Sequence, residues 1–289
     1  MNARSLALAA ALALGLVACG DQSVSTSGST PDSTATTADG QITYSTDPNA
    51  LLLRIDLSGG FVPVETIFTS LPQMSVYGDG TVITQGPQIA IYPGPAVPNL
   101  LVRTLDEEGI ETLLQTALDA GLVGPAPDYG QPPIADAPDT VVTINVDGKT
   151  YEHRANALGD FGTGDMGLTE AQADSRKALA TFVSAATDLA TLVGSDHLSA
   201  EEPYEITGWR LRATVADSLP TGEPAPTLTP WPVLGLALVS IGECTAVTGD
   251  EASAVTAAMQ QANQLTYFTE AGVTYQVLAR PLLPDESGC

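Results

Sequence analysis

The sequence is poor in positive charge. It contains two lysines, Lys149 and Lys177, and its 10 Lys and Arg residues stand against 34 Asp and Glu, which gives a formal net charge of −24 at pH 7. Because the basic residues form no cluster, binding to a phosphate backbone lacks its main attractive term, and we exclude nucleic acid as a partner. The acidic residues are scattered along the chain, which indicates a solvated surface.

Histidine is scarce as well, and this limits metal-assisted and nucleophilic chemistry. The two histidines, His153 and His197, have no metal-ligand partner at helical or loop spacing. Ser195-Asp196-His197 contains the residue types of a catalytic triad, but a triad needs them to converge from different parts of a fold. The G-x-G-x-x-G pattern at 162–167 lacks the parallel strands and the distant acid of a dinucleotide site. We therefore predict no catalytic residue, no metal site and no cofactor, so that an enzyme would have to work through carboxylates alone.

The sequence also lacks a hydrophobic run long enough to span a membrane, which requires about 20 apolar residues. The Ala/Leu-rich stretch at 5–16 is shorter, follows the positive charge of Arg4, and is typical of a signal peptide. It ends in a lipobox pattern, with the small residues Val17 and Ala18 before Cys19. We predict cleavage before Cys19 and lipid on its thiol. The alternative is an ordinary signal peptide followed by a chance cysteine.

Four parts are predicted along the chain. Residues 1–18 are a cleaved signal peptide, and 19–44 hold the lipidated cysteine and a disordered Ser/Thr/Gly tether, whose composition cannot bury enough apolar surface to fold. Residues 45–198 and 199–289 are two α+β units, with a single domain as the alternative. Two acyl chains give stable anchoring, so we expect the protein on the outer face of the cell membrane.

Cysteine occurs at three positions. With Cys19 taken by lipid, Cys244 and Cys289 remain as a pair in an oxidising compartment, and we predict a disulfide between them. The alternative for Cys289 is a free, reactive thiol.

Apolar spacing predicts an α+β fold, with antiparallel sheets and amphipathic helices packed on one face. Two predicted hairpins echo each other: Ile144 faces Tyr151 across a turn at Asp147, and Phe268 faces Tyr275. Either the chain contains two divergent helix–hairpin units, or the match is coincidence. Strands are predicted at 51–57, 74–77, 81–84, 140–146, 149–154, 204–215 and 233–241 and in a hairpin at 265–278, and helices at 106–118, 169–193 and 249–263.

Aromatic residues make up 5% of the chain, and two of them lie in proline-rich loops. Tyr92 is in the loop at 88–98, and Trp231 is in the loop at 220–232. Proline lowers the entropy lost on ordering and an aromatic ring supplies contact area, so both are candidate partner-binding residues. The alternative is that each ring caps the core.

Several features together carry a family resemblance. They are the lipobox, the Ser/Thr tether, the Tyr-Gly-Asp-Gly turn at 77–80, the Tyr-Pro-Gly-Pro loop at 92–95 and the Arg-Pro-Leu-Leu-Pro-Asp-Glu segment at 280–286 before the last cysteine. The chain resembles uncharacterised lipoproteins of high-GC actinobacteria over nearly its whole mature length. This resemblance implies a membrane location and no particular activity.

These observations lead to one main hypothesis of function and two alternatives. The main hypothesis is a non-enzymatic envelope lipoprotein whose domain binds a protein or another envelope component through its proline-rich loops. The first alternative is an envelope glycan hydrolase, which needs two carboxylates about 5 to 9 Å apart in a cleft. The second is a purely structural or stress-related surface protein.

Overall fold

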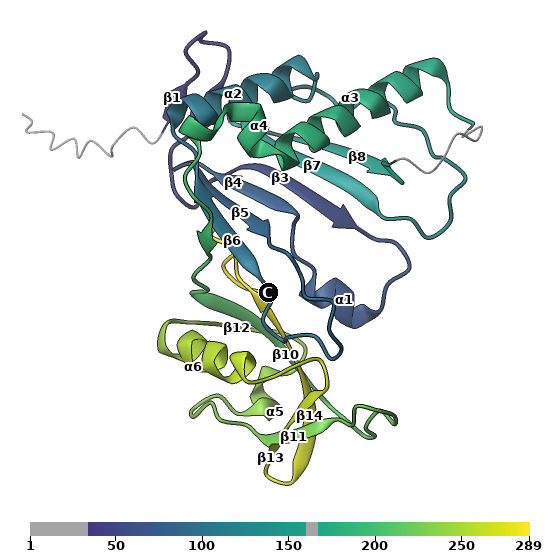
Figure 1. The fold of residues 1–289 in the computed structure, drawn as a ribbon, viewed down its shortest axis with the longest axis vertical. Helices are drawn as coiled ribbons and strands as arrows, with labels where there is room; N and C mark the ends of the chain where they lie inside the picture. The colour runs from purple at the N-terminus through teal and green to yellow at the C-terminus, as the bar shows by residue number, and fades with distance from the viewer. Residues whose placement is uncertain (1–33, 160–166) are drawn as a thin grey trace, which may run out of the picture. The chain divides into compact units, whose positions relative to one another are not determined.

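The computed structural model describes residues 34–159 and 167–289, which lie in one compact unit, Ser33–Cys289 (Figure 1). The fold is α+β with mainly antiparallel sheets, as the sequence predicts. The predicted signal peptide, Cys19 and the tether as far as residue 33 lie outside the described residues. Within the described ranges, no helix is long and apolar enough to cross a membrane.

The larger sheet has seven strands in the described residues, all paired antiparallel, in the order β8-β7-β3-β4-β5-β6-β9. The predicted hairpin register is confirmed, since Ile144 pairs with Tyr151. Asp147 and Gly148 both have positive φ, as a tight two-residue hairpin turn requires. The strands are β3 Leu51–Ser58, β4 Met74–Tyr77, β5 Thr81–Gln85, β6 Leu100–Thr104, β7 Asp139–Val146, β8 Lys149–Asn156 and β9 Glu202–Pro203.

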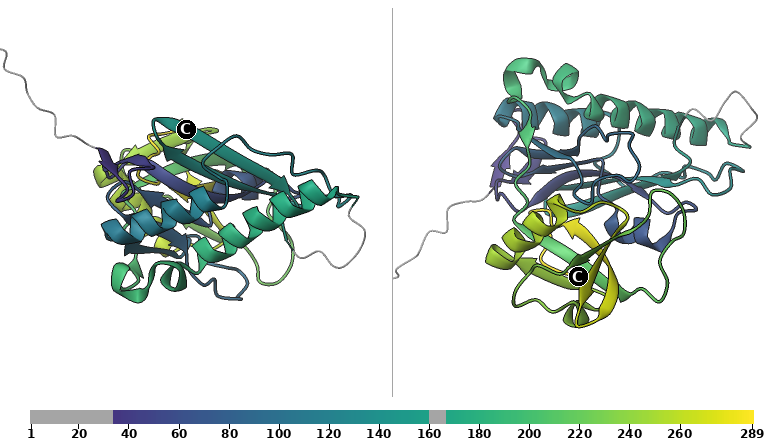
Figure 2. Two further views of the ribbon diagram at one scale, coloured as in Figure 1. Left: turned by 90° about the horizontal axis from the view of Figure 1, so that it is seen from above. Right: turned by 60° about the horizontal axis from the view of Figure 1, so that its bottom comes forward.

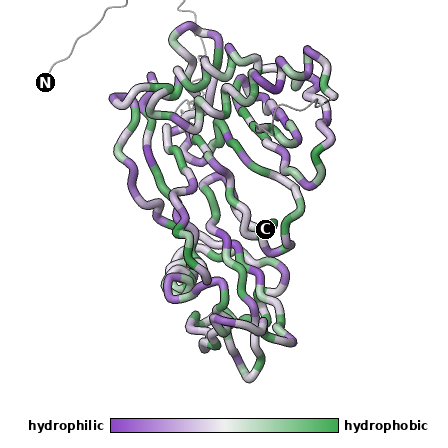
Figure 3. The backbone as a smooth tube through the Cα atoms, turned by 45° about the vertical axis from the view of Figure 1, so that its right-hand side comes forward, coloured by the Kyte–Doolittle hydropathy of each residue, from purple (hydrophilic) through white to green (hydrophobic). Residues whose placement is uncertain are grey.

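Helices α2 (Glu107–Asp119), α3 (Glu170–Thr187) and α4 (Leu189–Val193) cover one face of this sheet (Figures 1 and 2). Their apolar stripes meet alternate residues of the strands, so that Leu113 of α2 and Phe182 of α3 share a core with Leu53 of β3. Figure 3 shows hydrophobic and hydrophilic positions interspersed along most elements, as expected where one face is buried.

The predicted helix at 169–193 begins as expected but is not continuous. Thr169 and Gln172 form the predicted capping box. The helix then breaks at Asp188, and α4 follows as a separate short helix. The Thr187 hydroxyl donates to the carbonyl oxygens of Val183 and Ser184, and such back-bonding bends helices.

The predicted disordered tether extends too far toward the C-terminus. β1 (Thr34–Thr36) pairs with β2 (Thr43–Ser45), and Ile42 and Tyr44 are buried in the core of the larger sheet. The Asp147 carboxylate also accepts from the Thr43 amide at 2.8 Å. Burial of these two side chains, together with the β1–β2 pairing and the hydrogen bond to Asp147, stabilises a segment whose Ser/Thr composition alone predicts disorder.

The smaller sheet has the order β11-β13-β14-β10-β12, with β11 parallel to β13 and the other pairs antiparallel. Trp209 and Leu211 of β10 are fully buried beneath α6. The strands are β10 Gly208–Val215, β11 Thr227–Pro230, β12 Thr245–Thr248, β13 Thr266–Glu270 and β14 Val273–Pro281, and the helices are α5 Leu238–Ile241 and α6 Gly249–Gln260.

The strand predicted at 233–241 is wrong. This segment is a loop that ends in the short helix α5. A short apolar run does not by itself distinguish a strand from other buried structure. Here Gly235 adopts a φ of +88°, and Leu234 projects into solvent while Val233 and Leu236 are buried. An extended strand would not give this pattern of burial.

The two hairpins share the predicted local register, since Phe268 pairs with Tyr275 as Ile144 does with Tyr151. Their positions in the sheets differ, however. In the larger sheet β7 is internal and β8 lies at the edge, whereas in the smaller sheet both β13 and β14 have a further neighbour. Descent from one helix–hairpin unit therefore stays a prediction.

Leu283 and Asp285, which follow β14, pack on the face of the larger sheet that lies opposite its helices. Leu283 is buried there beside Tyr77. The Asp285 carboxylate accepts from the Arg54 guanidinium at 2.8 Å and from the Tyr77 hydroxyl at 2.9 Å. The segment that follows β14 therefore connects the two sheets.

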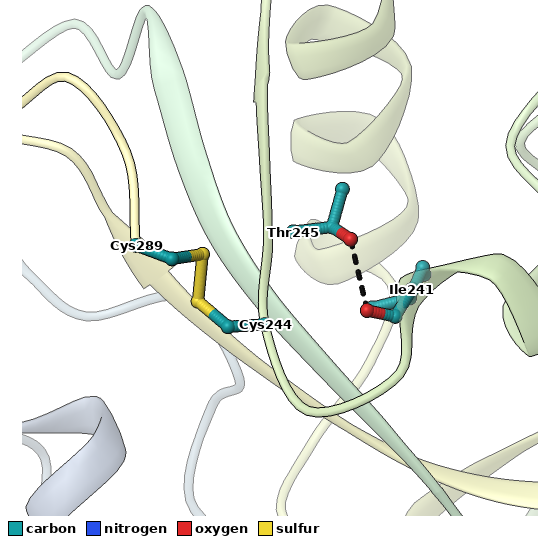
Figure 4. Close-up of a disulfide and its surroundings, with 4 residues drawn as sticks. All are labelled: Ile241, Cys244, Thr245 and Cys289. Carbon is teal, nitrogen blue, oxygen red and sulfur yellow. Dashed lines mark hydrogen bonds between the residues drawn. A yellow bond between two sulfur atoms is a disulfide. The ribbon is translucent and has the colours of Figure 1, made fainter.

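The predicted disulfide between Cys244 and Cys289 is confirmed (Figure 4). The two Cα atoms are 6.0 Å apart, and the neighbouring Thr245 hydroxyl donates to the Ile241 carbonyl oxygen at 2.8 Å. The bond joins Cys289 to the segment between α5 and β12. It thereby keeps the residues after β14 from fraying.

Candidate binding cleft

Trp231, one of the two candidate binding aromatics, makes its contacts within the protein. Its ring meets the ring of Phe268 edge to face, with centroids 4.9 Å apart. Its indole N–H donates to the Leu236 carbonyl oxygen at 2.7 Å. Because the polar group of Trp231 is satisfied internally and its ring packs on the core, the structure favours the alternative interpretation, in which this ring caps the smaller sheet.

Tyr92, the other candidate, is 66% exposed. Residues 94–96, which follow Tyr92 in the same loop, are hydrogen-bonded to the turn between α6 and β13. Gly94 and Gln264 exchange two hydrogen bonds, of 2.9 and 3.0 Å, and the Ala96 amide donates to Ala262 at 3.2 Å. The loop therefore runs from the larger sheet to the smaller one and holds Tyr92 in solvent. A binding role for Tyr92 stays a prediction.

A cleft of about 1260 Å³ lies beside this loop and is lined by parts of both sheets. Helix α1 (Val64–Thr69) and the adjoining ends of β4 and β5 contribute to its lining. The smaller sheet contributes residues 276–279 of β14, and the turn after α6 also lines the cleft. The loop itself contributes Gly86, Pro87, Gln88, Pro95, Ala96 and Pro98.

Uncharged polar groups supply much of the hydrogen-bonding capacity of the cleft. The side-chain amides of Gln73 and Gln276 and the hydroxyls of Thr66 and Thr84 line it and have no hydrogen-bond partner among the residues that the structure describes. By contrast, the Gln85 amide is already used, since it donates to the Leu71 carbonyl oxygen at 2.7 Å. Amides and hydroxyls both donate and accept hydrogen bonds, so the free groups can bind a ligand that offers hydrogen-bond donors or acceptors.

The charged side chains on the cleft lining are the carboxylates of Glu65 and Glu201, and no Lys, Arg or His of the described residues contributes to it. Most of the basic residues in the described ranges are bonded to the protein elsewhere. Four pair with carboxylates and two donate to backbone carbonyl oxygens: Arg54 with Asp285, Arg154 with Asp139, Arg212 with Glu243, Arg280 with Glu286, Arg103 with Ser199 and Arg176 with Ala157.

Exposed apolar side chains gather in the two segments that border the cleft. Among the described residues, eight of the thirteen large hydrophobic side chains that are exposed lie at 57–67 or 89–92. Phe61 is 86% exposed and Ile89 is 73% exposed. Of these eight, Leu57 is on the cleft lining, and the other seven lie in the segments that adjoin lining residues. Single exposed apolar residues need no explanation, but a concentration in two segments indicates an interaction surface. The eight are Leu57, Phe61, Val62, Val64, Ile67, Ile89, Ile91 and Tyr92.

His153 is a satisfied core histidine. Its Nε2 atom lies 2.9 Å from the Leu122 carbonyl oxygen, and its Nδ1 atom lies 2.7 Å from the Tyr129 hydroxyl. A carbonyl oxygen can only accept, so Nε2 carries the proton and Nδ1 accepts from Tyr129. Burial raises the pKa of Tyr129 to about 12, which keeps this hydroxyl a donor. His153 therefore has a structural role.

His197 has a structural role at the start of α2. Its Nδ1 atom lies 3.0 Å from the Asp106 carboxylate, which also accepts from the Gly109 amide and so caps the helix. The hydrogen bond to Asp106 raises the pKa of His197. The pKa of Asp106 is lowered, mainly by the hydrogen bond from the Gly109 amide and next by the hydrogen bond to His197. Ser195 to His197 form one short turn, as expected, and not a converging triad.

Asp56 on β3 has a carboxylate oxygen, Oδ1, that is buried without a hydrogen-bond partner in the described part of the chain. Burial raises the pKa of Asp56, against the lowering effects of the Leu57 amide and of Arg54. Asp56 does not line the cleft. Within the described ranges, no group of three or more His, Cys, Asp or Glu residues could hold a metal ion.

No protein-family model, curated protein or solved structure matches the chain. The resemblance to actinobacterial lipoproteins stays a prediction, and Cys19 lies outside the described residues. Sequence reasoning missed the cleft, because the segments that line it lie far apart in the sequence, from Leu57 to Ala279.

Proposed function

We propose that this chain is a lipid-anchored, extracytoplasmic binding protein whose ligand lies in the cleft between the two sheets. The observation that carries the proposal is the lining of that cleft. It combines free amides and hydroxyls with apolar side chains such as Leu57, Leu101 and Leu278, and such groups recognise a ligand by hydrogen bonding and by burial of apolar surface.

The N-terminal sequence and the disulfide support the proposed location. A lipobox before Cys19 predicts a diacylglyceryl anchor, and a disulfide between Cys244 and Cys289 fits an oxidising compartment. Cys19→Ala should release the protein from the membrane fraction or leave an unprocessed precursor. Intact-mass measurement of the wild-type protein tests this directly, and a mature chain that starts elsewhere and carries no lipid would contradict the anchor.

Site-specific photo-crosslinking in intact cells tests the proposed binding site. A photoreactive residue is placed at Thr66, Gln73 or Gln276 on the cleft, and at Asp174 or Glu251 on exposed helical surface as matched controls. We expect the cleft positions to capture one common ligand that the control positions do not capture. Equal capture at both sets of positions, or none at the cleft, would refute a binding role for the cleft.

The glycan-hydrolase alternative has one observation in its favour, the two carboxylates of Glu65 and Glu201 on the cleft lining. Such an enzyme needs a general acid together with a nucleophile or base. It predicts that purified protein releases soluble fragments from envelope glycan and that either Glu65→Gln or Glu201→Gln abolishes the release. Binding without release of fragments supports the binding protein.

A further inference from the structure

We infer that the occupant of the cleft is an extended peptide segment that combines apolar side chains with a positive charge. This inference rests on the proposed function and specifies the chemical class of the ligand. The charge of the cleft, its apolar side chains and its free polar groups support this inference.

The charge of the cleft favours a cation. Glu65 and Glu201 are its charged lining residues, and both are exposed. The formal charge of the chain is −24, and most of its described basic residues are already bonded to the protein. A Lys or Arg side chain entering the cleft therefore gains attraction, whereas an anionic ligand is repelled.

The apolar side chains favour a peptide over two other classes of ligand, a neutral glycan and an anionic membrane surface. A neutral glycan would leave the aliphatic lining side chains of Leu57, Leu101 and Leu278 without an apolar partner. An anionic membrane surface attracts segments rich in Lys and Arg, and neither bordering segment, 57–67 or 86–98, contains either residue. A peptide can cover aliphatic side chains with its own apolar side chains.

The size and the polar groups of the cleft also fit a polypeptide. Its volume of about 1260 Å³ exceeds the roughly 300 to 1000 Å³ of typical small-ligand pockets. An extended chain offers a backbone donor and an acceptor at nearly every residue. The free amides of Gln73, which precedes β4, and of Gln276 in β14 both line the cleft and can bond to such donors and acceptors.

Three synthetic peptides provide the test. Each alternates valine with threonine over about ten residues, and they differ only in carrying two lysines, two glutamines or two glutamates. Fluorescence anisotropy at physiological ionic strength measures their affinities for the folded, oxidised protein. We expect the lysine peptide to bind most tightly, the glutamine peptide less tightly and the glutamate peptide least tightly.

Charge variants test whether the lysine peptide is attracted by the two carboxylates of the cleft or by the overall negative charge of the protein. The double variant Glu65→Gln, Glu201→Gln should weaken the lysine peptide by about three- to tenfold, as expected for two exposed ion pairs, and leave the glutamine peptide unchanged. The matched control Asp174→Asn, Glu251→Gln removes the same charge from exposed helical positions and should change neither affinity.

Apolar variants test the apolar lining. The double variant Leu57→Thr, Leu101→Thr should weaken all three peptides by about tenfold, because each substitution removes apolar area on the cleft lining that the peptide would bury. The control Leu234→Thr, Val239→Thr changes two exposed apolar residues that lie outside the bordering segments and do not line the cleft, and it should leave the affinities unchanged.

Two outcomes would overturn the inference. In the first, cleft and control variants weaken the lysine peptide equally, which would assign the attraction to the net charge of the protein. In the second, the crosslinked cleft positions capture a glycan, a lipid or an acidic protein, which would leave the proposed binding function intact. The proposed function itself fails only if the cleft positions capture nothing specific.

Discussion

The ion pair between Arg280 and Glu286 should be among the most costly single contacts to lose in this fold. The two side chains are 8% and 16% exposed, and the guanidinium binds both carboxylate oxygens, at 2.6 and 2.9 Å. Its Nε atom donates to the Ser70 carbonyl oxygen at 2.6 Å, so the same arginine links β14 to the chain that precedes β4. In addition, Arg210 lies directly opposite Arg280 across the β10–β14 pair.

Glu286→Ala removes the carboxylate and leaves the buried guanidinium of Arg280 uncompensated, facing Arg210. Breaking a buried pair in this way costs about 3–5 kcal/mol. For a domain of this size, that cost lowers Tm by about 6–20 °C. A matched control is Glu243→Ala, which breaks the pair with Arg212. Because the Glu243 carboxylate is 79% exposed, the expected loss is at most about 1 kcal/mol.

Urea unfolding of the oxidised protein, followed by far-UV circular dichroism and tryptophan fluorescence, measures both losses. If the cost comes from an uncompensated buried charge, the double variant Arg280→Met, Glu286→Leu should recover most of the lost stability. The reasoning is refuted if Glu286→Ala costs no more than Glu243→Ala. It is also refuted if the double variant is less stable than Glu286→Ala.

Three further predictions concern the disulfide, the start of α2 and the two aromatic loops. Cys244→Ser should lower the free energy of unfolding by about 2–5 kcal/mol, and alkylation of the denatured, unreduced wild type should find no free thiol in this pair. The pKa of His197 is raised above 6.5, so its contribution to stability is complete below that pH and is lost as the pH rises through the folded-state pKa. For Asp106 the pKa is lowered, so its contribution is present above the ordinary value near 3.8 and is lost as the pH falls through the folded-state pKa. An NMR titration should give His197 a midpoint above 6.5 that falls toward the ordinary value in Asp106→Asn, and an unchanged midpoint would contradict the pairing. Trp231→Ala should cost about 3–5 kcal/mol because it removes a packed ring, whereas Tyr92→Ala should leave thermal stability nearly unchanged, and similar losses for both would contradict their different environments.

The sequence by itself determined the local structure of the hairpins, of most helices and of the cysteine pair. The Asp147-Gly148 turn fixes which residues face each other across β7 and β8, because a two-residue turn leaves one register. Apolar spacing and the Asp106 cap define α2. These features depend on neighbours in the sequence, so the residues that cause them are visible in it.

Tertiary structure decided where order begins, which aromatic ring is buried and what lines the cleft. Ile42 and Tyr44 become ordered because the core of a sheet formed later in the chain receives them. Tyr92 and Trp231 are both aromatic residues in proline-rich loops, yet Trp231 meets Phe268 while Tyr92 remains in solvent. The cleft joins α1 to β14, segments that lie far apart in the sequence. The sequence of α1 or of β14 alone does not reveal that the two segments meet. The burial of a side chain depends on its neighbours in the folded protein, and most of these neighbours are distant in the sequence.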